Sequence, residues 1–506
     1  MKCIPSRRIL PIFLTITAFF AAFFTVFAAV LPNTSAAAPT ADGFYAGAVA
    51  LDITPERPVT LSGQFYTRIS KGVYTPIMAN ILALNSIKDG KSTPAILVSM
   101  DVVSIHEPFN LEFRKRLQEE FPDVPSENII LCATHTHAGP NLGNDPADLP
   151  KDADIMHGNE YAQFVLDKLI PAVRKAWESQ VPSRYGYGLG FVNIAYNRRA
   201  VYADGSAVMY GKTDRPDFRS IEGMTDTDLN ALCIWDKNDK LTAMLLNVAC
   251  PSQENEHLYY LDADFWGRAR NQICAKYGKD VVVLGTCGAA GDQSPHIRYR
   301  SAAEERMMKL RGLSRVEELG RRIAVAVDDI YELIASDKKE DPVMKFEYLA
   351  LDLPQRIITE KEYQTAQAEA ARLEAEYKKT GSSKAFGQMN WNRRTVKRYE
   401  RAKEDPGQTY STSACVLRLG DIVLCTNQFE LYTDFGIQMK ARSKAVQTFV
   451  IQLASGRPAC GTYLPTEFAV KGGGYGAVPA SNMVGPEGGR MLVEETLKAV
   501  ERMFAE

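Results

Sequence analysis

The sequence predicts an α/β protein in which mixed, largely parallel sheet layers are flanked by helices, with one charged helical insertion. Short apolar runs with the length of buried strands alternate with longer amphipathic segments. Several of these runs end in a polar residue or in glycine, as strands do where they open into a loop. Strand, helix and strand in succession favour right-handed crossovers and parallel pairing.

The first 38 residues are expected to be a signal peptide. Lys2, Arg7 and Arg8 precede an apolar run over 9–31, and small residues follow at 35–38. We therefore expect an exported protein, periplasmic, at the cell surface or secreted, whose folded domain covers 39–506. Because the apolar run is long, an uncleaved membrane anchor is the alternative.

The first half of the domain alternates between the two patterns. Apolar or alternating runs predict strands, and segments with helical spacing predict helices. The expected strands are 43–54, 81–84, 95–100, 128–132, 184–192, 231–235, 243–248 and 281–285. The expected helices are 109–121, 158–181, 264–277 and 315–336.

The second half contains the insertion. Residues 356–404 are rich in Glu, Lys, Arg, Gln and Ala, which predicts one or two solvent-exposed helices or a protruding hairpin. Strands at 414–417 and 422–426, a glycine-rich loop at 471–475 and a last helix at 488–504 follow.

Charge and cysteine content limit the partners, disulfides and metal sites that this chain is expected to have. With 59 basic and 61 acidic residues the net charge is −2, so no bulk field favours nucleic acid as a partner. Several of the eight cysteines after the leader lie in apolar runs, where a buried free thiol is expected. The sequence has no CxxC pair, so a zinc ribbon is not expected, and it does not determine which cysteines form disulfides.

The strand ending at 131–140 carries the first chemical signal. His135 and His137 follow an apolar run and precede Gly139-Pro140, and residues i and i+2 of a strand point to the same face. Histidine is the commonest metal ligand. A metal site and two polar histidines in a surface turn are both compatible with this segment taken alone.

Other polar residues also follow apolar runs or lie in loops. They are Asp101, Cys250 with His257, Ser294, Glu430, Tyr463 and Tyr475. Singly, each of these residues is more often structural than catalytic.

Together the motifs resemble the neutral/alkaline (non-lysosomal) ceramidases, which are zinc amidohydrolases. The similar segments are Ala133–Pro140, Asn197-Arg198, Gly291–Pro295, Phe429–Gly436 and Tyr463–Thr466, with Asp52–Pro55 at the start. The resemblance runs from about residue 45 to the C-terminus and implies a ceramidase-like catalytic domain. The further C-terminal β-sandwich domain of typical ceramidases has no expected counterpart here.

The resemblance implies a role for each matching residue. His135, Glu430 and Tyr463 would be ligands of Zn²⁺. His137 would orient or polarise a water or the substrate carbonyl, and Ser294 would be the catalytic serine, as nucleophile or as positioner of a zinc water. Arg198 and Tyr475 would bind substrate and stabilise the tetrahedral oxyanion. Zinc suits amide hydrolysis because it polarises a carbonyl and lowers the pKa of bound water to about 7.

One metal ligand of the family is replaced in this sequence. Where a second zinc histidine is expected, counting back from Asp264 places Cys250. A thiolate is a good zinc ligand, so Cys250 is the first candidate for the metal. The alternatives are that His257 reaches the metal from the loop, or that the site binds metal weakly or not at all.

The leading expectation is an exported zinc-dependent hydrolase of an N-acyl bond that splits ceramide, or a related N-acyl lipid, into fatty acid and sphingoid base. A lipid or other small-molecule substrate is compatible with peripheral membrane contact, and the oligomeric state stays open. One alternative is an esterase or deacetylase acting on a glycan or another non-ceramide substrate. The other is a non-catalytic binding protein with a degenerate metal site.

Overall fold

The computed structural model describes residues 39–146, 149–150, 152–454 and 462–505, which belong to one unit, and its largest element is an eight-stranded sheet. The strand order is β14-β13-β12-β7-β1-β4-β5-β6. The bounds are β1 (Gly43–Asp52), β4 (Met78–Lys88), β5 (Lys91–Met100), β6 (Ile129–Ala133), β7 (Val181–Phe191), β12 (Asp228–Asp236), β13 (Leu241–Val248) and β14 (Val282–Cys287). The predicted leader or anchor, residues 1–38, lies outside the described residues, and the domain boundary at residue 38 stays a prediction.

The sheet is mixed but less parallel than the sequence predicted. Only the edge pairs β5–β6 and β13–β14 are parallel, and all other neighbours are antiparallel. Short turns explain the difference: Asp89-Gly90 joins β4 to β5, and 237–240 joins β12 to β13. Such connections can only return the chain antiparallel.

A second sheet of four strands packs on the first. Its order is β16-β17-β18-β20, with bounds β16 (Met344–Pro354), β17 (Thr409–Leu419), β18 (Ile422–Thr426) and β20 (Gln447–Ile451). Alternate residues of each strand face the other sheet, as Leu82 and Leu84 of β4 and Leu417 and Leu424 of the second sheet do in one shared core.

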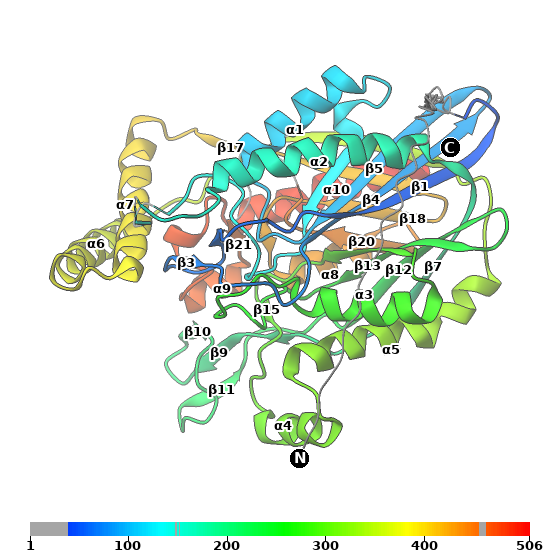
Figure 1. Cartoon of the computed structure of the whole chain (residues 1–506). Coiled ribbons are helices and arrows are strands. Elements are labelled where there is room, and N and C mark those ends of the chain that lie inside the picture. Colours follow the sequence, from blue (N-terminus) through cyan, green and yellow to red (C-terminus); the bar gives the residue numbers. More distant parts are fainter. Residues whose placement is uncertain (1–38, 147–148, 151, 455–461, 506) are drawn as a thin grey trace, which may run out of the picture. The chain divides into compact units, whose positions relative to one another are not determined.

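Helices cover the two outer faces (Figure 1). Helices α1 (Glu107–Glu120) and α2 (Gly158–Glu178) pack on the β1-β4-β5-β6 half, and α3 (Asp264–Tyr277) and α5 (Arg315–Ser336) on the β7-β12-β13-β14 half. Helices α8 (Thr433–Arg442) and α10 (Pro486–Phe504) cover the four-stranded sheet. The result is four layers, helix, sheet, sheet and helix, which confirms the α/β class with helix-flanked mixed sheets.

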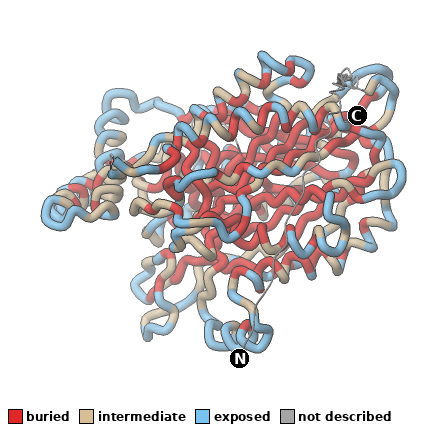
Figure 2. Tube along the Cα trace, in the orientation of Figure 1, coloured by how far each residue is buried: buried red, intermediate tan, exposed pale blue. Residues whose placement is uncertain are grey.

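The charged insertion forms two helices, α6 (Glu360–Thr380) and α7 (Ser383–Glu404), between β16 and β17. It has its own small core of Leu373, Ala385 and Met389. Figure 2 shows buried residues along the central strands and a mostly exposed α6–α7 hairpin, as the composition predicted.

Shorter elements complete the chain. They are β2 (Thr60–Leu61), β3 (Arg68–Ile69), η1 (Ser126–Asn128), β8 (Tyr196–Asn197), β9 (Arg199–Tyr202), β10 (Ala207–Met209), β11 (Phe218–Ile221), β15 (Gln293–Ser294), α4 (Ser301–Arg311), β19 (Glu430–Leu431), β21 (Tyr463–Leu464), α9 (Glu467–Gly472) and η2 (Pro479–Ser481).

Two absences concern the described residues only. None of their helices has the length and hydrophobicity needed to cross a bilayer. The cysteines among them, Cys132, Cys233, Cys250, Cys274, Cys287, Cys415 and Cys425, are free thiols.

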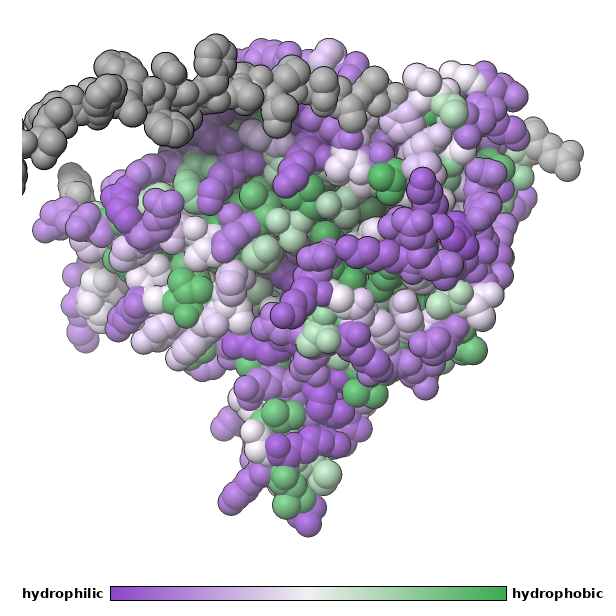
Figure 3. All heavy atoms as spheres, turned by 45° about the vertical axis from the view of Figure 1, so that its right-hand side comes forward, coloured by the Kyte–Doolittle hydropathy of each residue, from purple (hydrophilic) through white to green (hydrophobic). Residues whose placement is uncertain are grey.

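On the face seen in Figure 3 hydrophilic residues predominate, with hydrophobic residues between them in separate patches.

Candidate active site

The segments that follow the C-terminal ends of β5, β6, β13, β14 and β18 meet at one end of the sheets. Several contacts join them: Thr134 N–H donates to Met100 O, His137 N–H donates to Ser252 O, and Gly291 N–H donates to Leu431 O. Figure 1 shows β15 and β21 on the side toward the α6–α7 hairpin. Ligand sites of α/β proteins commonly lie outside the carboxyl ends of the strands.

His135 is held in a strained and buried position just after β6. Its φ is 65°, in the left-handed region that non-glycine residues rarely adopt, and its side chain is almost fully buried. Its Nδ1 lies 2.7 Å from the carbonyl oxygen of Val103. A carbonyl only accepts, so Nδ1 carries the proton and, in a neutral ring, Nε2 presents a lone pair.

The Nε2 lone pair of His135 faces two other polar groups. His137 Nε2 is 3.3 Å away and Glu430 Oε2 is 3.5 Å away. His137 Nδ1 lies 3.2 Å from the Glu256 carboxylate, and burial lowers the pKa of His137, so this ring is neutral at neutral pH. The proton of neutral His137 can lie on Nδ1, facing Glu256, or on Nε2, from which it would be donated to the lone pair of His135 Nε2.

A short parallel pairing brings Glu430 and Tyr463 together. Glu430 in β19 is the register partner of Tyr463 in β21. Burial raises the pKa of the Glu430 carboxyl, but the hydrogen bond and charge of His135 in its protonated form and the charge of Arg198 outweigh it and hold that pKa below its ordinary value. Burial and the Glu430 charge raise the pKa of Tyr463 well above its usual range, so its hydroxyl keeps its proton.

Arg198 is the buried cation of the site. It follows β8, which pairs with β15, and its backbone N–H donates to Asp292 O at 2.8 Å. Its guanidinium donates to Tyr210 Oη at 2.7 Å, Gly291 O at 2.9 Å and Tyr463 Oη at 3.3 Å, and lies 4.0 Å from Glu430 Oε2. These contacts fix a positive charge beside the Glu430 carboxylate.

Tyr475 extends the site toward the α6–α7 hairpin. Its ring centroid is 5.3 Å from that of Tyr463, 5.9 Å from that of Phe65 and 5.5 Å from that of Trp391 on α7. Tyr475 is 38% exposed, unlike the buried Tyr463. Its partly open ring is therefore placed to contact a substrate that enters beside α7.

The structure does not bring Cys250 to the histidines. Its thiol is fully buried in the core of the α3–α5 half and lies 3.5 Å from Ile194 O and 3.6 Å from Pro251 O. Burial and the neighbouring Cys287 raise the pKa of this thiol well above its ordinary value. His257 is exposed, and no polar contact is found for it among the described residues. Cys250 as a ligand stays a prediction without a supporting contact.

Ser294 lies beside the site, but its hydroxyl is not bonded to a histidine ring. It is fully buried in β15, where its Oγ accepts the His296 backbone N–H at 3.2 Å. Asp292, two residues earlier, accepts from Asn197 Nδ2 at 2.8 Å and from Thr433 Oγ1 at 2.6 Å. These bonds hold the turn that carries Ser294 against the loop of Arg198.

The sequence did not identify four residues that lie near the predicted set, namely Glu256, His296, Gln253 and Tyr210. Glu256 faces both His137 and, at 3.8 Å, His296. Gln253 accepts from Arg198 at 3.3 Å and also binds Tyr210, whose hydroxyl accepts from Arg198. Glu256 and Gln253 lie in the segment where Cys250 and His257 were singled out, so the segment was indicated but not the side chains that face inward.

The donor set fits a cation only in part. Among the residues that the structure describes, no group of three or more His, Cys, Asp and Glu side chains could hold a metal ion. Tyr463 would add an oxygen donor beside His135 and Glu430, and the carbonyl of Val103 orients the His135 ring. His135, Glu430 and Tyr463 as zinc ligands stay a prediction.

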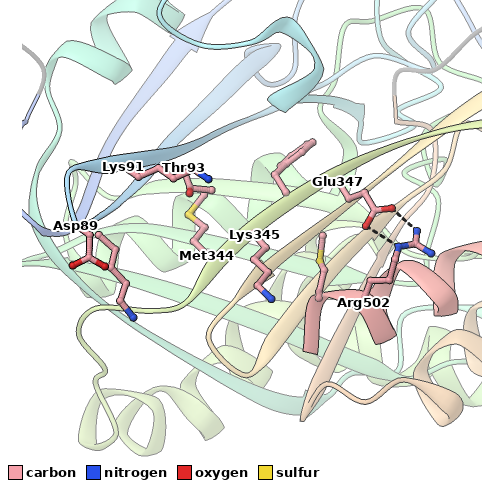
Figure 4. Close-up of a pocket in the computed structure, with 10 residues that line it drawn as sticks. Asp89, Lys91, Thr93, Met344, Lys345, Glu347 and Arg502 are labelled. Carbon is pink, nitrogen blue, oxygen red and sulfur yellow. Dashed lines mark hydrogen bonds and ion pairs between the residues drawn. The ribbon is translucent and has the colours of Figure 1, made fainter. Parts of the chain in front are cut away.

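A separate hollow of about 580 Å³ lies at the opposite end of β5 (Figure 4). Lys88 and Lys91 flank the β4–β5 turn there, whereas the candidate site follows Met100 at the other end of the strand. Glu347 and Arg502 pair with each other across this hollow. It is therefore distinct from the candidate site.

Comparisons with known proteins find similarity to neutral ceramidase. No family model matches the chain. Neutral ceramidase of Pseudomonas aeruginosa is 24% identical over 151 residues, which cover 30% of this chain and only 21% of that protein. The crystal structure of neutral ceramidase from Pseudomonas aeruginosa matches 92% of this chain and 76% of its own, with 15% identity and a TM-score of 0.64. A structure described as ceramidase complexed with C2 matches 91% of this chain and 76% of its own, with 15% identity and a TM-score of 0.63. The resemblance indicated by the motifs is confirmed, and the chain is neutral-ceramidase-like in fold.

Proposed function

We propose that the protein is a zinc-dependent hydrolase of an N-acyl bond, with ceramide or a related N-acyl lipid as its substrate. The observation that carries the proposal is the buried group of His135, Glu430, Arg198 and Tyr463, in a fold like that of neutral ceramidase. We propose export as well, on the basis of the predicted leader.

His135, Glu430 and Tyr463 are the proposed zinc ligands. When bound, zinc would polarise the amide carbonyl and lower the pKa of a water. The unprotonated Nε2 of His135, the ionised Glu430 and the phenol oxygen of Tyr463 are the donors available for it. Cys250 and His257 are not needed to reach three ligands.

The remaining residues act on the substrate and on protons. Neutral His137, backed by the Glu256 carboxylate, can accept the proton of an attacking water at Nε2. The guanidinium of Arg198 can donate to the oxygen on which negative charge develops, and Tyr475 can donate from the open side. Such a donor is worth about 3 kcal/mol of transition-state stabilisation. Ser294 stays a proposed catalytic serine, and its burial in β15 favours a positioning role.

The experiment combines metal analysis with hydrolysis. Protein from residue 39 onward is expressed, and zinc is measured by mass spectrometry beside release of fatty acid from a fluorescent short-chain ceramide. We expect one bound zinc and activity that a chelator abolishes and added zinc restores. His135→Ala and Glu430→Gln should lose both, and Asp167→Asn, on the exposed face of α2, should lose neither.

The outcomes separate the three candidate functions. Zinc with hydrolysis of acetylated amino sugars, but not of ceramide, would favour the glycan deacetylase. A chain without zinc and without activity after zinc is added would favour the non-catalytic binding protein and overturn the proposal.

A further inference from the structure

The α6–α7 hairpin closes one side of a pocket of about 500 Å³. Its walls are the loops 61–67, 103–106 and 141–146 together with the first turns of α7. Helix α7 approaches the first of these loops closely, because a Cβ on Gly387 would lie 3.1 Å from the carbonyl oxygen of Phe65. The insertion is therefore part of the pocket wall.

The pocket adjoins the paired histidines. Val103 lines it and accepts the proton of His135 Nδ1, and Gly63 lines it so close to His137 that a Cβ there would lie 2.6 Å from His137 Cγ. Phe65, also in the lining, packs against Tyr475. A molecule whose scissile bond lies at His137 can extend into this pocket.

The lining is mixed, with more apolar than polar surface, and its one formal charge is positive. Among the lining residues, all of them in the described part of the chain, there is no carboxylate. The side-chain amides of Asn141, Asn144 and Asn390 supply hydrogen-bond donors, and His106 is neutral because burial lowers its pKa. The charge belongs to Arg394 of α7.

Arg394 differs from its neighbours in lacking a counter-ion. In the described residues it makes no hydrogen bond or ion pair, whereas Arg393 pairs with Glu374 at 2.8 Å and Arg356 pairs with Glu362 at 2.7 Å. Arg394 is exposed, so its guanidinium is open to a ligand in the pocket. Nε and Nη2 of Arg398 are buried without an acceptor, while its Nη1 donates to Pro479 O at 2.7 Å. Burial and the charges of Arg356 and Arg394 lower the pKa of Arg398 to about 10, so an anion bound at Arg394 would relieve part of this repulsion.

We propose that this pocket is a substrate subsite that takes an anionic head group, a carboxylate or a phosphate, held by Arg394. The substrate is then an N-acyl compound whose amine part carries the anion. This inference rests on the proposed function and narrows its substrate class. It also gives the charged insertion a role, because α7 supplies the residue that selects the head group.

The test uses matched pairs of amides that differ in one charge. N-dodecanoylglycine is compared with its neutral carboxamide, N-dodecanoylglycinamide, for a carboxylate, and ceramide 1-phosphate with ceramide for a phosphate. Arg394→Gln should raise KM for the anionic member of one pair about ten- to a hundredfold and leave its neutral member unchanged, since a hydrogen bond to a charged group is worth that much. Arg394→Lys should recover part of the loss, and Arg393→Gln is the matched control on the same helix.

Binding without turnover separates this inference from the proposed function. If none of the four compounds is hydrolysed, their binding to the wild-type chain and to Arg394→Gln is measured by thermophoresis. Tighter binding of the anionic member, lost in Arg394→Gln but not in Arg393→Gln, supports the subsite even though the proposed hydrolysis fails. Equal effects of the two variants, or equal affinity for the two members of both pairs, would overturn it.

Discussion

Asp101 links the end of β5 to helix α3 beneath the site. Its fully buried carboxylate accepts from Arg270 Nη1 at 2.5 Å and Nη2 at 3.0 Å, from Met78 N–H at 3.0 Å and from Thr134 Oγ1 at 3.2 Å. The start of the segment that carries His135 is therefore tied through Thr134 to a buried ion pair.

We predict that Asp101→Asn destabilises the fold by about 3–5 kcal/mol, because it leaves the Arg270 guanidinium buried without its counter-ion. Urea unfolding followed by circular dichroism measures the change. Asp167→Asn is the control, because its pair with Arg116 is exposed and should contribute about 1 kcal/mol or less. Similar losses in the two variants would contradict the prediction.

Gln253 illustrates why some residues near the site could not be predicted from the sequence. Counting along the chain located the segment correctly, but after β13 the backbone turns, with Cys250 N–H donating to Val248 O and Gln253 N–H donating to Pro251 O. The turn sends the thiol into the core and Gln253 toward Arg198. A motif gives the position of a residue in the sequence, whereas the path of the loop decides which side chain faces inward.

At the level of elements, helix α2 approaches β1 so closely at Gly47 that there is no room for a side chain. A Cβ on Gly47 would lie 2.1 Å from the carbonyl oxygen of Ala176, which real contacts do not allow. Because the atom that this Cβ would meet belongs to the backbone of α2, the helix itself would have to shift.

We predict that Gly47→Ala costs about 1–3 kcal/mol or more of stability and lowers hydrogen-exchange protection in α2. Gly407→Ala is the control, because nothing lies within 4 Å of the Cβ it would add. Unchanged protection in α2 would show that the helix does not depend on this close approach.

The elements that the sequence predicted well are those in which apolar residues recur at regular helical spacing within the element itself. Helix α5 has the predicted bounds, and α2 has a sustained apolar stripe. The two-residue strands β19 and β21, which place Glu430 beside Tyr463, have no local period, because their pairing joins residues 33 positions apart in the chain. The parallel character of the large sheet was overestimated for a related reason, since tight turns rather than apolar runs decide strand direction.

At the scale of the whole molecule, two buried acids with raised pKa values contribute to the response to pH. Burial and the charges of Asp264 and Glu256 raise the pKa of Glu254 to about 8, against an opposing effect of Arg315. Burial and the charge of Asp262 raise the pKa of Asp264 to about 7. Both groups bind a proton in the folded chain at pH values where the unfolded chain has already lost it.

We predict that stability is highest below about pH 4 as far as these two groups are concerned. It falls as pH rises, to about 7 for Asp264 and about 8 for Glu254, by up to about 1.4 kcal/mol per pH unit for each group. Denaturation midpoints at several pH values measure the slope. Glu254→Gln should flatten it, and a slope that this variant leaves unchanged would assign the pH dependence to other groups.

The place of the insertion in the second sheet has a consequence for how the protein can change. Strands β16 and β17 pair in unbroken register up to Pro354 and Thr409, so α6 and α7 emerge where a simple turn would also connect the two strands. The pairing of β16 with β17 therefore does not depend on the two helices. Replacing or reshaping α6 and α7 would change the wall of the pocket beside His137 while the residues proposed to cut the bond stay where they are.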